Sequence, residues 1–269
     1  MTTITRNDKA RGGRTYTIDG NEYPSVTTVL QVIAKPALIP WAKKVSLEKV
    51  RAELYTYVDD PLFGGQRTLE RRDVDAIVEA ARKRPDEVRD AAGDFGTAAH
   101  GLIERILSGE EVVPTPPWEP VVKNFLAWRE QAGLTITASE RIVYSKANGF
   151  AGTLDGLATR DGVPVVLDWK TSNGLWPEMR LQVAAYALAY SEMQNADIRE
   201  AWIVRFNKDT PKKPEQAFEA VKMDGKALAD AQAAFVKGMK RHKKRLTLTE
   251  LAAATYVCRD QVRNILRGR

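Results

Sequence analysis

Two aspartates in the middle of the chain have the residue type and spacing that metal-dependent chemistry needs. Asp155 lies in residues 152–158, and Asp168 follows the apolar run 163–167. The Asp161-Gly162 pair between them is typical of a tight β-turn, so we expect a hairpin with the two aspartates on neighbouring strands. Carboxylates that converge in this way repel one another unless a cation lies between them. A divalent metal ion is the simplest such cation.

Lys170 adds a basic side chain, charged as an ammonium group, to the two carboxylates. It follows Asp168 by two positions, so on a strand both side chains emerge on one face while Trp169 points to the other face. A hard cation on oxygen ligands lowers the pKa of a bound water, and a nearby ammonium orients that water or stabilises charge on a phosphate. These are the groups that phosphodiester hydrolysis requires.

The wider pattern resembles a known family. Asp155 and the triplet Asp168-Trp169-Lys170 precede a predicted helix from Pro177, on which Gln182 and Tyr186 are four residues apart. This ordered set resembles the PD-(D/E)xK nuclease superfamily and, within it, the RecB-like exonuclease branch. It is similar to phage exonucleases and the mitochondrial genome maintenance exonuclease. A lone D-x-K is common on solvated strands, whereas the ordered set is far more specific.

The resemblance implies an α/β fold, with a restriction-endonuclease-like mixed central sheet flanked by helices and a helical C-terminal tail. It also implies one or two Mg²⁺ or Mn²⁺ ions, bound by three side chains and one carbonyl: His100, Asp155, Asp168 and Trp169. Lys170 would position or activate the attacking water, and Gln182 would orient water or substrate. Tyr186 has two interpretations, a functional hydroxyl or ring and a core aromatic with a satisfied hydroxyl.

His100 lies on a helix predicted over residues 94–107, with Asp94 as its cap and Gly109 after its end. A preceding helix over residues 74–84 is expected to be interrupted by Pro85. A histidine on an apolar helix is most often a core residue, but the resemblance implies a metal ligand, because Gly96 and His100 match the branch's G-x-x-x-H pattern. Glu104, four residues on, is either a partner of that ligand or a surface acid.

Glu140 is a weaker candidate. It lies on a strand predicted over residues 135–144, near a point where many members of the resembled branch carry an acid. Such an acid could orient a metal ligand or a water. The simpler interpretation is an exposed strand residue.

The resemblance implies an exonuclease acting on DNA with a free end, in phage or prophage DNA replication, recombination or repair. One alternative is a structure-specific endonuclease that shares the same site. A second is a non-catalytic DNA-binding protein that uses the basic C-terminal helices. The sequence indicates no protein partner.

The composition of the chain excludes several classes of protein. At 269 residues and 43% hydrophobic, the chain can bury a substantial core. No apolar run approaches the roughly 20 residues of a membrane span, and the polar N-terminus lacks a signal peptide's apolar core, so we expect a cytoplasmic protein, bacterial or phage-encoded. The single cysteine, Cys258, excludes an intrachain disulfide and a four-cysteine iron–sulfur cluster.

The positive charge is concentrated at the C-terminus. Residues 236–269 contain ten Lys and Arg against two acids, a net charge of +8, whereas the whole chain carries +6. Such a segment favours a polyanion partner, or is simply a solvated helix end. Residues 246–269 also resemble a helix-turn-helix, or form a plain helical hairpin packed on the body. We therefore expect a disordered N-terminus (1–14), a nuclease domain (15–245) and a basic tail (246–269).

Six residues are candidates for contact with DNA: Ser25, Thr27, Lys208, Lys243, Lys244 and Arg245. Ser25 and Thr27 belong to the segment Pro24-Ser25-Val26-Thr27, which matches a PSVT segment in RecB-like and phage relatives. A structural alternative for Ser25 is the N-cap of a short helix.

Overall fold

The computed structural model describes residues 2–10, 12–33, 35, 37–58 and 68–255, with side chains described as far as residue 242. The chain forms two compact units, Met1–Ile33 with Ala99–Arg269, and Ala34–Ala98. In the described part of the chain, no helix is long and apolar enough to cross a membrane. The first unit contains every residue of the candidate site.

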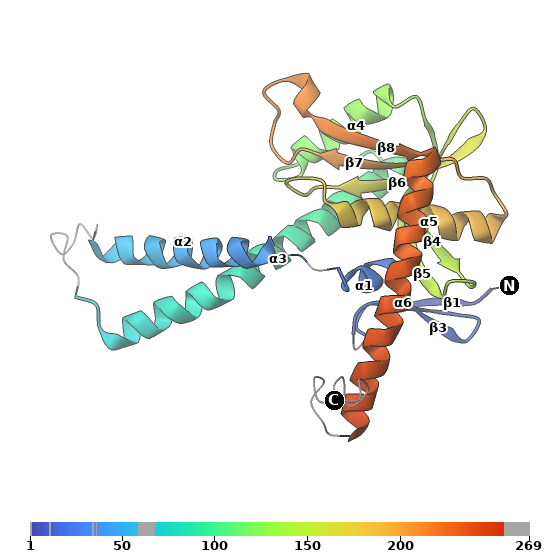
Figure 1. Cartoon of the computed structure of the whole chain (residues 1–269). Coiled ribbons are helices and arrows are strands. Elements are labelled where there is room, and N and C mark those ends of the chain that lie inside the picture. Colours follow the sequence, from blue (N-terminus) through green and yellow to red (C-terminus); the bar gives the residue numbers. More distant parts are fainter. Residues whose placement is uncertain (1, 11, 34, 36, 59–67, 256–269) are drawn as a thin grey trace. The chain divides into compact units, whose positions relative to one another are not determined.

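A five-stranded sheet forms the centre of the first unit (Figure 1). In spatial order its strands are β4 (Thr135–Ser145), β5 (Phe150–Arg160), β6 (Val163–Lys170), β7 (Glu200–Phe206) and β8 (Phe218–Asp224). Strands β6 and β7 pair in parallel and the other neighbours are antiparallel. The predicted mixed central sheet is therefore confirmed.

The predicted hairpin joins β5 to β6. Asp161 and Gly162 both have positive φ, 52° and 78°, as a two-residue turn between twisted strands requires. The turn sets Arg160 opposite Val163, and the register continues to Gly156 opposite Leu167. Because the register is fixed, each side chain of β6 points to a defined face of the sheet.

Helices cover both faces of the sheet. On one face, α5 (Pro177–Gln194) and α6 (Gly225–Thr255) share a large apolar core with Val166 of β6. On the other, α4 (Glu119–Gln131) contributes Trp128, whose ring centroid lies 5.0 Å from that of Trp169. Trp169 therefore anchors β6 from one face and leaves Asp168 and Lys170 on the face of α5.

A second sheet of three strands lies at the N-terminus: β1 (Ile4–Asn7), β2 (Thr15–Ile18) and β3 (Asn21–Pro24). Strand β1 corrects the expectation that residues 1–14 are disordered. It pairs with β2, and Ile4 packs against the buried Tyr16 and Ile18. Apolar burial and a ladder of backbone hydrogen bonds therefore order this segment.

Ser25 caps the short helix α1 (Val26–Leu30), whose Thr28 amide donates to the serine hydroxyl at 3.0 Å. The helix touches the central sheet, because Ser25 also forms a parallel bridge with Ala151 of β5. The structural alternative for Ser25 is thus confirmed.

The long helix α3 (Arg71–Leu107) corrects the expectation of two helices separated at Pro85. Proline removes one backbone donor and disfavours a helix interior, yet this helix continues through it, and Asp94 is an interior residue and no cap. The C-terminal end agrees with the prediction, since Gly109 follows at φ 89° and its amide donates to Ile106. Residues after Ala98, His100 among them, belong to the first unit.

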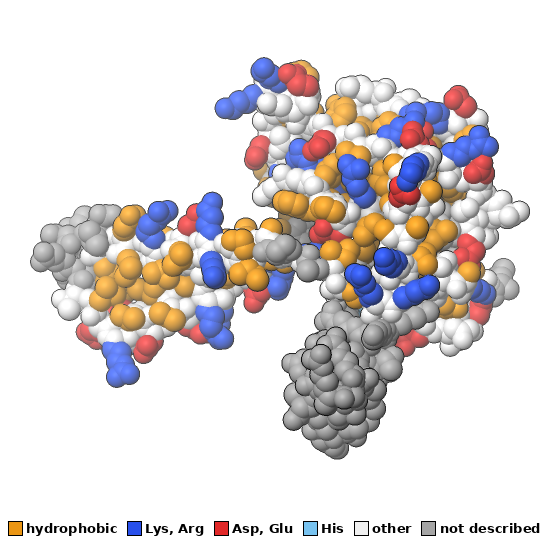
Figure 2. Space-filling view, in the orientation of Figure 1, with side chains coloured by type: hydrophobic (Ala, Val, Ile, Leu, Met, Phe, Trp, Pro, Cys, Tyr) orange, Lys and Arg blue, Asp and Glu red, His pale blue; other side chains and the backbone are white. Residues whose placement is uncertain are grey.

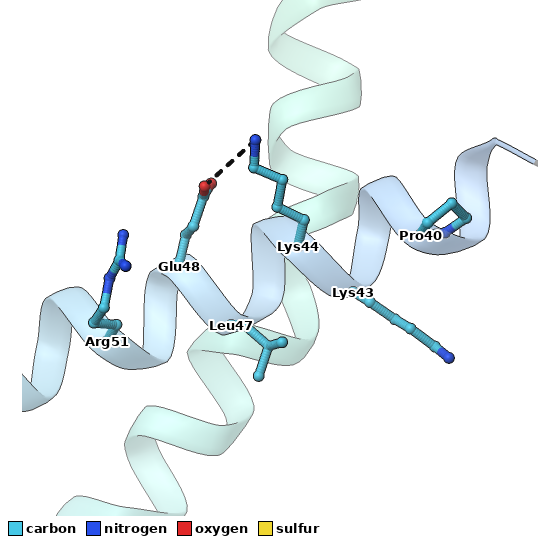
Figure 3. A pocket seen from close by; sticks show the side chains of 6 residues that line it. All are labelled: Pro40, Lys43, Lys44, Leu47, Glu48 and Arg51. Carbon is cyan, nitrogen blue, oxygen red and sulfur yellow. Dashed lines mark ion pairs between the residues drawn. The ribbon is translucent and has the colours of Figure 1, made fainter.

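The second unit holds α2 (Leu38–Val58) and the first part of α3. Figure 2 shows hydrophobic side chains gathered on its surface, and Ile39, Leu47 and Tyr55 are each more than half exposed. Residues along α2, Lys43 and Leu47 among them, line an open pocket, and Figure 3 shows their side chains.

Helix α6 is continuous through residues 245 and 246, where a separate tail is expected to begin. No break in the backbone separates the two parts there. The rest of the predicted helix-turn-helix, residues 256–269, lies outside the described residues.

Candidate active site

Asp155 and Asp168 meet where β5 and β6 separate. The backbone ladder between these strands ends at the pair Gly156 and Leu167, and the two aspartates occupy the next position. Here a side chain replaces the ladder, because the amide of Trp169 donates to Oδ2 of Asp155 at 2.8 Å. The carboxylate of Asp155 is thus fixed beside Asp168, on neighbouring strands as the sequence predicts.

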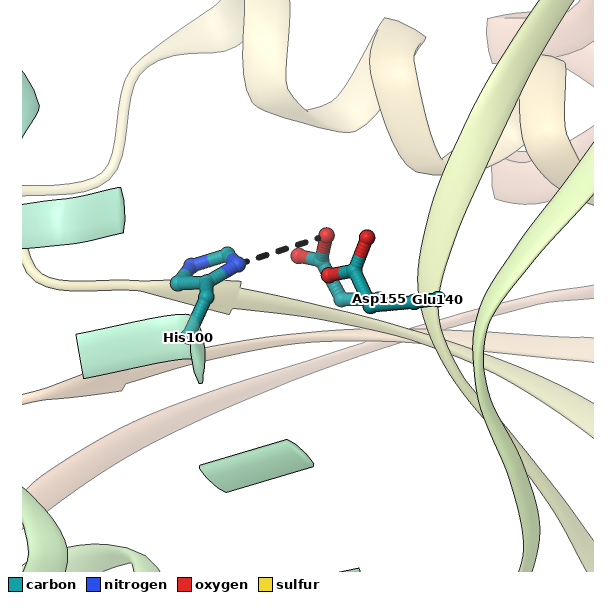
Figure 4. A group of neighbouring side chains, drawn as sticks. All are labelled: His100, Glu140 and Asp155. Atoms are coloured by element: carbon teal, nitrogen blue, oxygen red, sulfur yellow. Dashed lines mark ion pairs between the residues drawn. The ribbon is translucent and has the colours of Figure 1, made fainter. Parts of the chain in front are cut away.

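His100 reaches the same point from the last turns of α3. Its Nδ1 lies 3.5 Å from Oδ1 of Asp155, as the dashed line in Figure 4 marks. Burial disfavours the charged imidazole, but the negative charge and hydrogen bond of Asp155 outweigh it and raise the pKa of His100. In return, the same contact lowers the pKa of Asp155 against its burial.

Glu140 of β4 joins this pair. One potential ligand atom from each of His100, Glu140 and Asp155 lies within 4.8 Å of the others (Figure 4). The side chain is half-buried, which differs from the expected exposed strand acid. Burial and the neighbouring charge of Asp155 raise the pKa of Glu140. The structure therefore brings this weaker candidate into the centre of the site.

Asp168 is the most constrained carboxylate of the site. It is 0% exposed, and neither carboxylate oxygen has a hydrogen-bond partner among the described residues, although Lys170 forms an ion pair with Oδ2. Burial raises the pKa of Asp168 to about 7, because the Lys170 ammonium only partly offsets it. Asp168 is not one of the three residues whose ligand atoms lie within 4.8 Å of one another, but its charge acts on Asp155 and His100 from the next strand. The carboxylates and the imidazole together are of the kind that bind a divalent cation.

Gln182 and Tyr186 lie on one side of α5 and contact each other. Nε2 of Gln182 donates to the Tyr186 hydroxyl at 3.0 Å. The tyrosine is 4% exposed, and burial raises its pKa well above the usual value. These facts support the interpretation of Tyr186 as a core aromatic with a satisfied hydroxyl.

Gly152 makes room for this tyrosine. A Cβ at this position would lie 2.6 Å from Cε1 of Tyr186, closer than van der Waals contact allows. Glycine at this position therefore permits the close approach of Tyr186 to the backbone of β5.

The remaining candidates form no hydrogen bond or ion pair with His100, Asp155 or Asp168 in the described part of the chain, although the charge of Glu104 acts on Glu140. Glu104 is exposed, and no hydrogen bond or ion pair joins it to His100 in the described part of the chain. Ser25 is 2% exposed and its hydroxyl is already bonded within the cap, whereas Thr27 is exposed. Lys208 lies in the loop between β7 and β8. The side chains of Lys243, Lys244 and Arg245 lie outside the described residues.

Sequence reasoning missed one group of the site, the backbone amide of Trp169. Its hydrogen bond to Asp155 depends on the separation of two strands, which no residue type announces. The proximity of Glu140 to Asp155 depends on the register of β4 against β5, which the sequence pattern does not fix. The β4–β5 pairing places Ser139 opposite Gly156 and Arg141 opposite Leu154, which leaves Glu140 opposite Asp155.

Comparison with known proteins gives one family. Residues 118–268, more than half of the chain, match the family model of the PD-(D/E)XK nuclease superfamily. The sequence has no significant match among curated proteins.

Solved structures with some likeness include two exonucleases. An alkaline exonuclease from Laribacter hongkongensis has a TM-score of 0.42 and 12% identity, over 87% of this chain and 95% of that chain. A phage related exonuclease from Haemophilus somnus 129PT has a TM-score of 0.28 and 14% identity, over 58% of this chain and 82% of that chain. These scores are low, so the family assignment rests on the family model.

Proposed function

The chain belongs to the PD-(D/E)XK nuclease superfamily, and from this premise we propose that it is a metal-dependent DNA exonuclease of the RecB-like branch. One observation carries the proposal. The carboxylate of Asp168 is fully buried near the charge of Asp155, and its ion pair with Lys170 only partly offsets the cost of burial, so a divalent cation would compensate the remaining negative charge. Two buried carboxylates side by side are costly in a site that only binds DNA.

The ligands we propose are His100, Asp155 and Asp168, with Mg²⁺ or Mn²⁺ as the ion. A divalent cation bound there supplies Lewis-acid stabilisation of a phosphate and lowers the pKa of a water. The Trp169 amide holds Asp155 in position, so this ligand is preorganised.

Lys170 has the position to act on the substrate. It pairs with Asp168 and keeps 15% of its side chain exposed, so a phosphate bound at the site would be accessible to it. There its ammonium would orient the attacking water and neutralise charge in the transition state. Gln182, which has a second donor and a carbonyl oxygen besides its bond to Tyr186, would orient water or a phosphate oxygen.

The exonuclease part of the proposal, and a role in phage or prophage DNA metabolism within the cytoplasm, rest on the resemblance of Asp155, the Asp168-Trp169-Lys170 triplet, Gln182 and Tyr186 to the RecB-like branch. Thr27, Lys208 and the basic part of α6 are the proposed contacts to the DNA backbone, because cations and exposed hydroxyls bind phosphate. Ser25 is not among them, because its hydroxyl is buried in the α1 cap.

Degradation of a linear, end-labelled single-stranded DNA beside a closed circle of the same sequence tests the proposal. The assay contains Mg²⁺, Mn²⁺ or a chelator, and an Asp155→Asn variant controls for contaminating nucleases. We expect loss of the linear DNA alone, only with metal and only with the native protein. Cleavage of the circle would instead indicate an endonuclease, and binding without cleavage of either DNA would indicate a DNA-binding protein.

A further inference from the structure

The backbone of β4 is in an unusual conformation at Glu140. Four non-glycine residues have positive φ in the described chain. Asp19 and Asp161 do so in hairpin turns, and Asn195 does so at the C-cap of α5. Glu140 has φ 47° inside a strand, where no turn requires it. Side chains other than glycine, asparagine and aspartate rarely adopt this region, so the conformation has an energetic cost of about 1 kcal/mol.

This conformation interrupts the sheet at one pair. The β4–β5 pairing runs through Ser139 with Gly156 and resumes at Arg141 with Leu154, and Glu140 with Asp155 is left out. Directly opposite residues of an antiparallel pair project from the same face. The strand therefore gives up regular pairing at the position that puts a second carboxylate beside Asp155.

The fold does not supply a partner for that carboxylate. Within the described residues, no hydrogen bond or ion pair engages Glu140, and its half-buried side chain lies close to another acid. The backbone strain at Glu140, its lost strand pairing and its repulsion from Asp155 all oppose folding. A structural role for Glu140 therefore does not explain this arrangement.

We propose that Glu140 is a direct oxygen ligand of the divalent cation, together with His100 and Asp155, and that the left-handed conformation of β4 aims its carboxylate at that cation. Ligands bound at about 2.0–2.6 Å from one hard cation lie up to about 4–5 Å apart, which the 4.8 Å separation of these three groups nearly meets. The inference rests on the proposed function, because it deepens the description of the same metal site.

A second consequence distinguishes this proposal from a structural role. If the backbone at Glu140 is strained for the sake of the ligand, glycine at this position relieves the strain while it removes the carboxylate. Stability and metal affinity then change in opposite directions. If Glu140 mattered only for folding, its replacement by glycine would lower stability and leave the Mn²⁺ affinity of the folded protein unchanged.

The test measures Mn²⁺ binding to the full chain without DNA, by electron paramagnetic resonance of the free ion. We expect Glu140→Gln to weaken Mn²⁺ binding by at least about tenfold, as loss of a charged ligand should. Glu130→Gln, the same change at an exposed position of α4, should leave binding unchanged. Native affinity in the Glu140→Gln protein would overturn the proposal.

Glu140→Gly is the second variant, and thermal unfolding in chelator is its readout. We expect its melting temperature to equal or exceed that of the native protein, together with weakened Mn²⁺ binding. Loss of stability in this variant, with native Mn²⁺ affinity, would show a structural role and contradict the proposal. A native protein that binds no Mn²⁺ contradicts both this inference and the proposed function, whereas native metal-dependent cleavage with unchanged binding in Glu140→Gln contradicts the inference alone.

Discussion

Asp155 accepts a 2.8 Å hydrogen bond from the backbone amide of Trp169, across the point where the ladder between β5 and β6 ends. A side chain thus takes the place of the next backbone partner. This contact stops the strands from separating further and orients one carboxylate oxygen. The other oxygen remains available to His100 and to a cation. The ladder between β5 and β6 therefore ends where the proposed metal site begins.

Replacement of Lys170 by alanine tests whether this residue acts in catalysis and not in metal binding. Loss of a charge that stabilises the transition state should lower the rate of metal-dependent cleavage by about 10²–10³-fold. Mn²⁺ binding should be retained or tighter, because Lys170 no longer competes for Asp168. Single-turnover cleavage and Mn²⁺ titration measure the two effects. Lys123→Ala, on the exposed surface of α4, is the control, and full activity of the Lys170 variant would defeat its assigned role.

Asp168 should make the metal-free protein less stable as pH rises. Its pKa is about 7 in the folded state against an ordinary value of 3.8, so the folded protein binds the proton more tightly than the unfolded chain. The resulting stabilisation is present below about pH 4 and is lost as pH rises toward 7. Asn cannot titrate, so Asp168→Asn should gain on the order of 2 kcal/mol relative to native protein between pH 5 and pH 8.

Urea unfolding in chelator at these two pH values measures the gain. Asp209→Asn, in an exposed loop, supplies the control and should show no comparable change. An equal difference between native and Asp168→Asn protein at both pH values would mean that the buried carboxyl does not titrate in this range.

Much of the fold and part of the site were predictable from sequence because they depend on local patterns. The Asp161-Gly162 turn defines the hairpin, and side-chain alternation on β6 puts Asp168 and Lys170 on one face. The helix from Pro177 brings Gln182 and Tyr186 together through their spacing of four. In each case the decisive information lies within about ten residues.

The failures involve interactions that local patterns do not carry. Pro85 normally ends a helix, but α3 continues through it. Strand β1 is ordered by packing of Ile4 on a hairpin that lies beyond residue 14. Glu140 was assigned to an exposed position because strand alternation does not foresee a positive φ. Register and backbone strain arise from tertiary structure, so sequence reasoning gave Glu140 too little weight.

Metal binding should release protons. Cation binding requires a neutral ligand nitrogen on His100 and ionised carboxylates on its other ligands, whereas the pKa values of His100 and Asp168 are raised in the metal-free protein. At about pH 6.5 we expect release of on the order of one proton per Mn²⁺, and weaker binding as pH falls. Calorimetry in two weakly chelating buffers with different ionisation enthalpies measures the protons. Identical heats in the two buffers would contradict the prediction.

Gly152→Ala should disturb the site through Tyr186. The added methyl would lie 2.6 Å from Cε1 of Tyr186 and 3.3 Å from Val26, and a tyrosine that is 4% exposed has little room to move. Overpacking of this kind costs about 1–3 kcal/mol, and a displaced ring would also break the bond from Gln182. Thermal unfolding and cleavage rate measure the two consequences.

Gly238→Ala is the matched control, because its Cβ would meet nothing within 4 Å in the helix α6. That variant should gain about 0.5–1 kcal/mol, since alanine favours a helix over glycine. Opposite signs for the two glycines would show that close approach to Tyr186, and no general intolerance of alanine, makes Gly152 necessary. If Gly152→Ala were as stable as native protein, the ring of Tyr186 would have to move freely, and the packed arrangement of Gln182 and Tyr186 would not hold in solution.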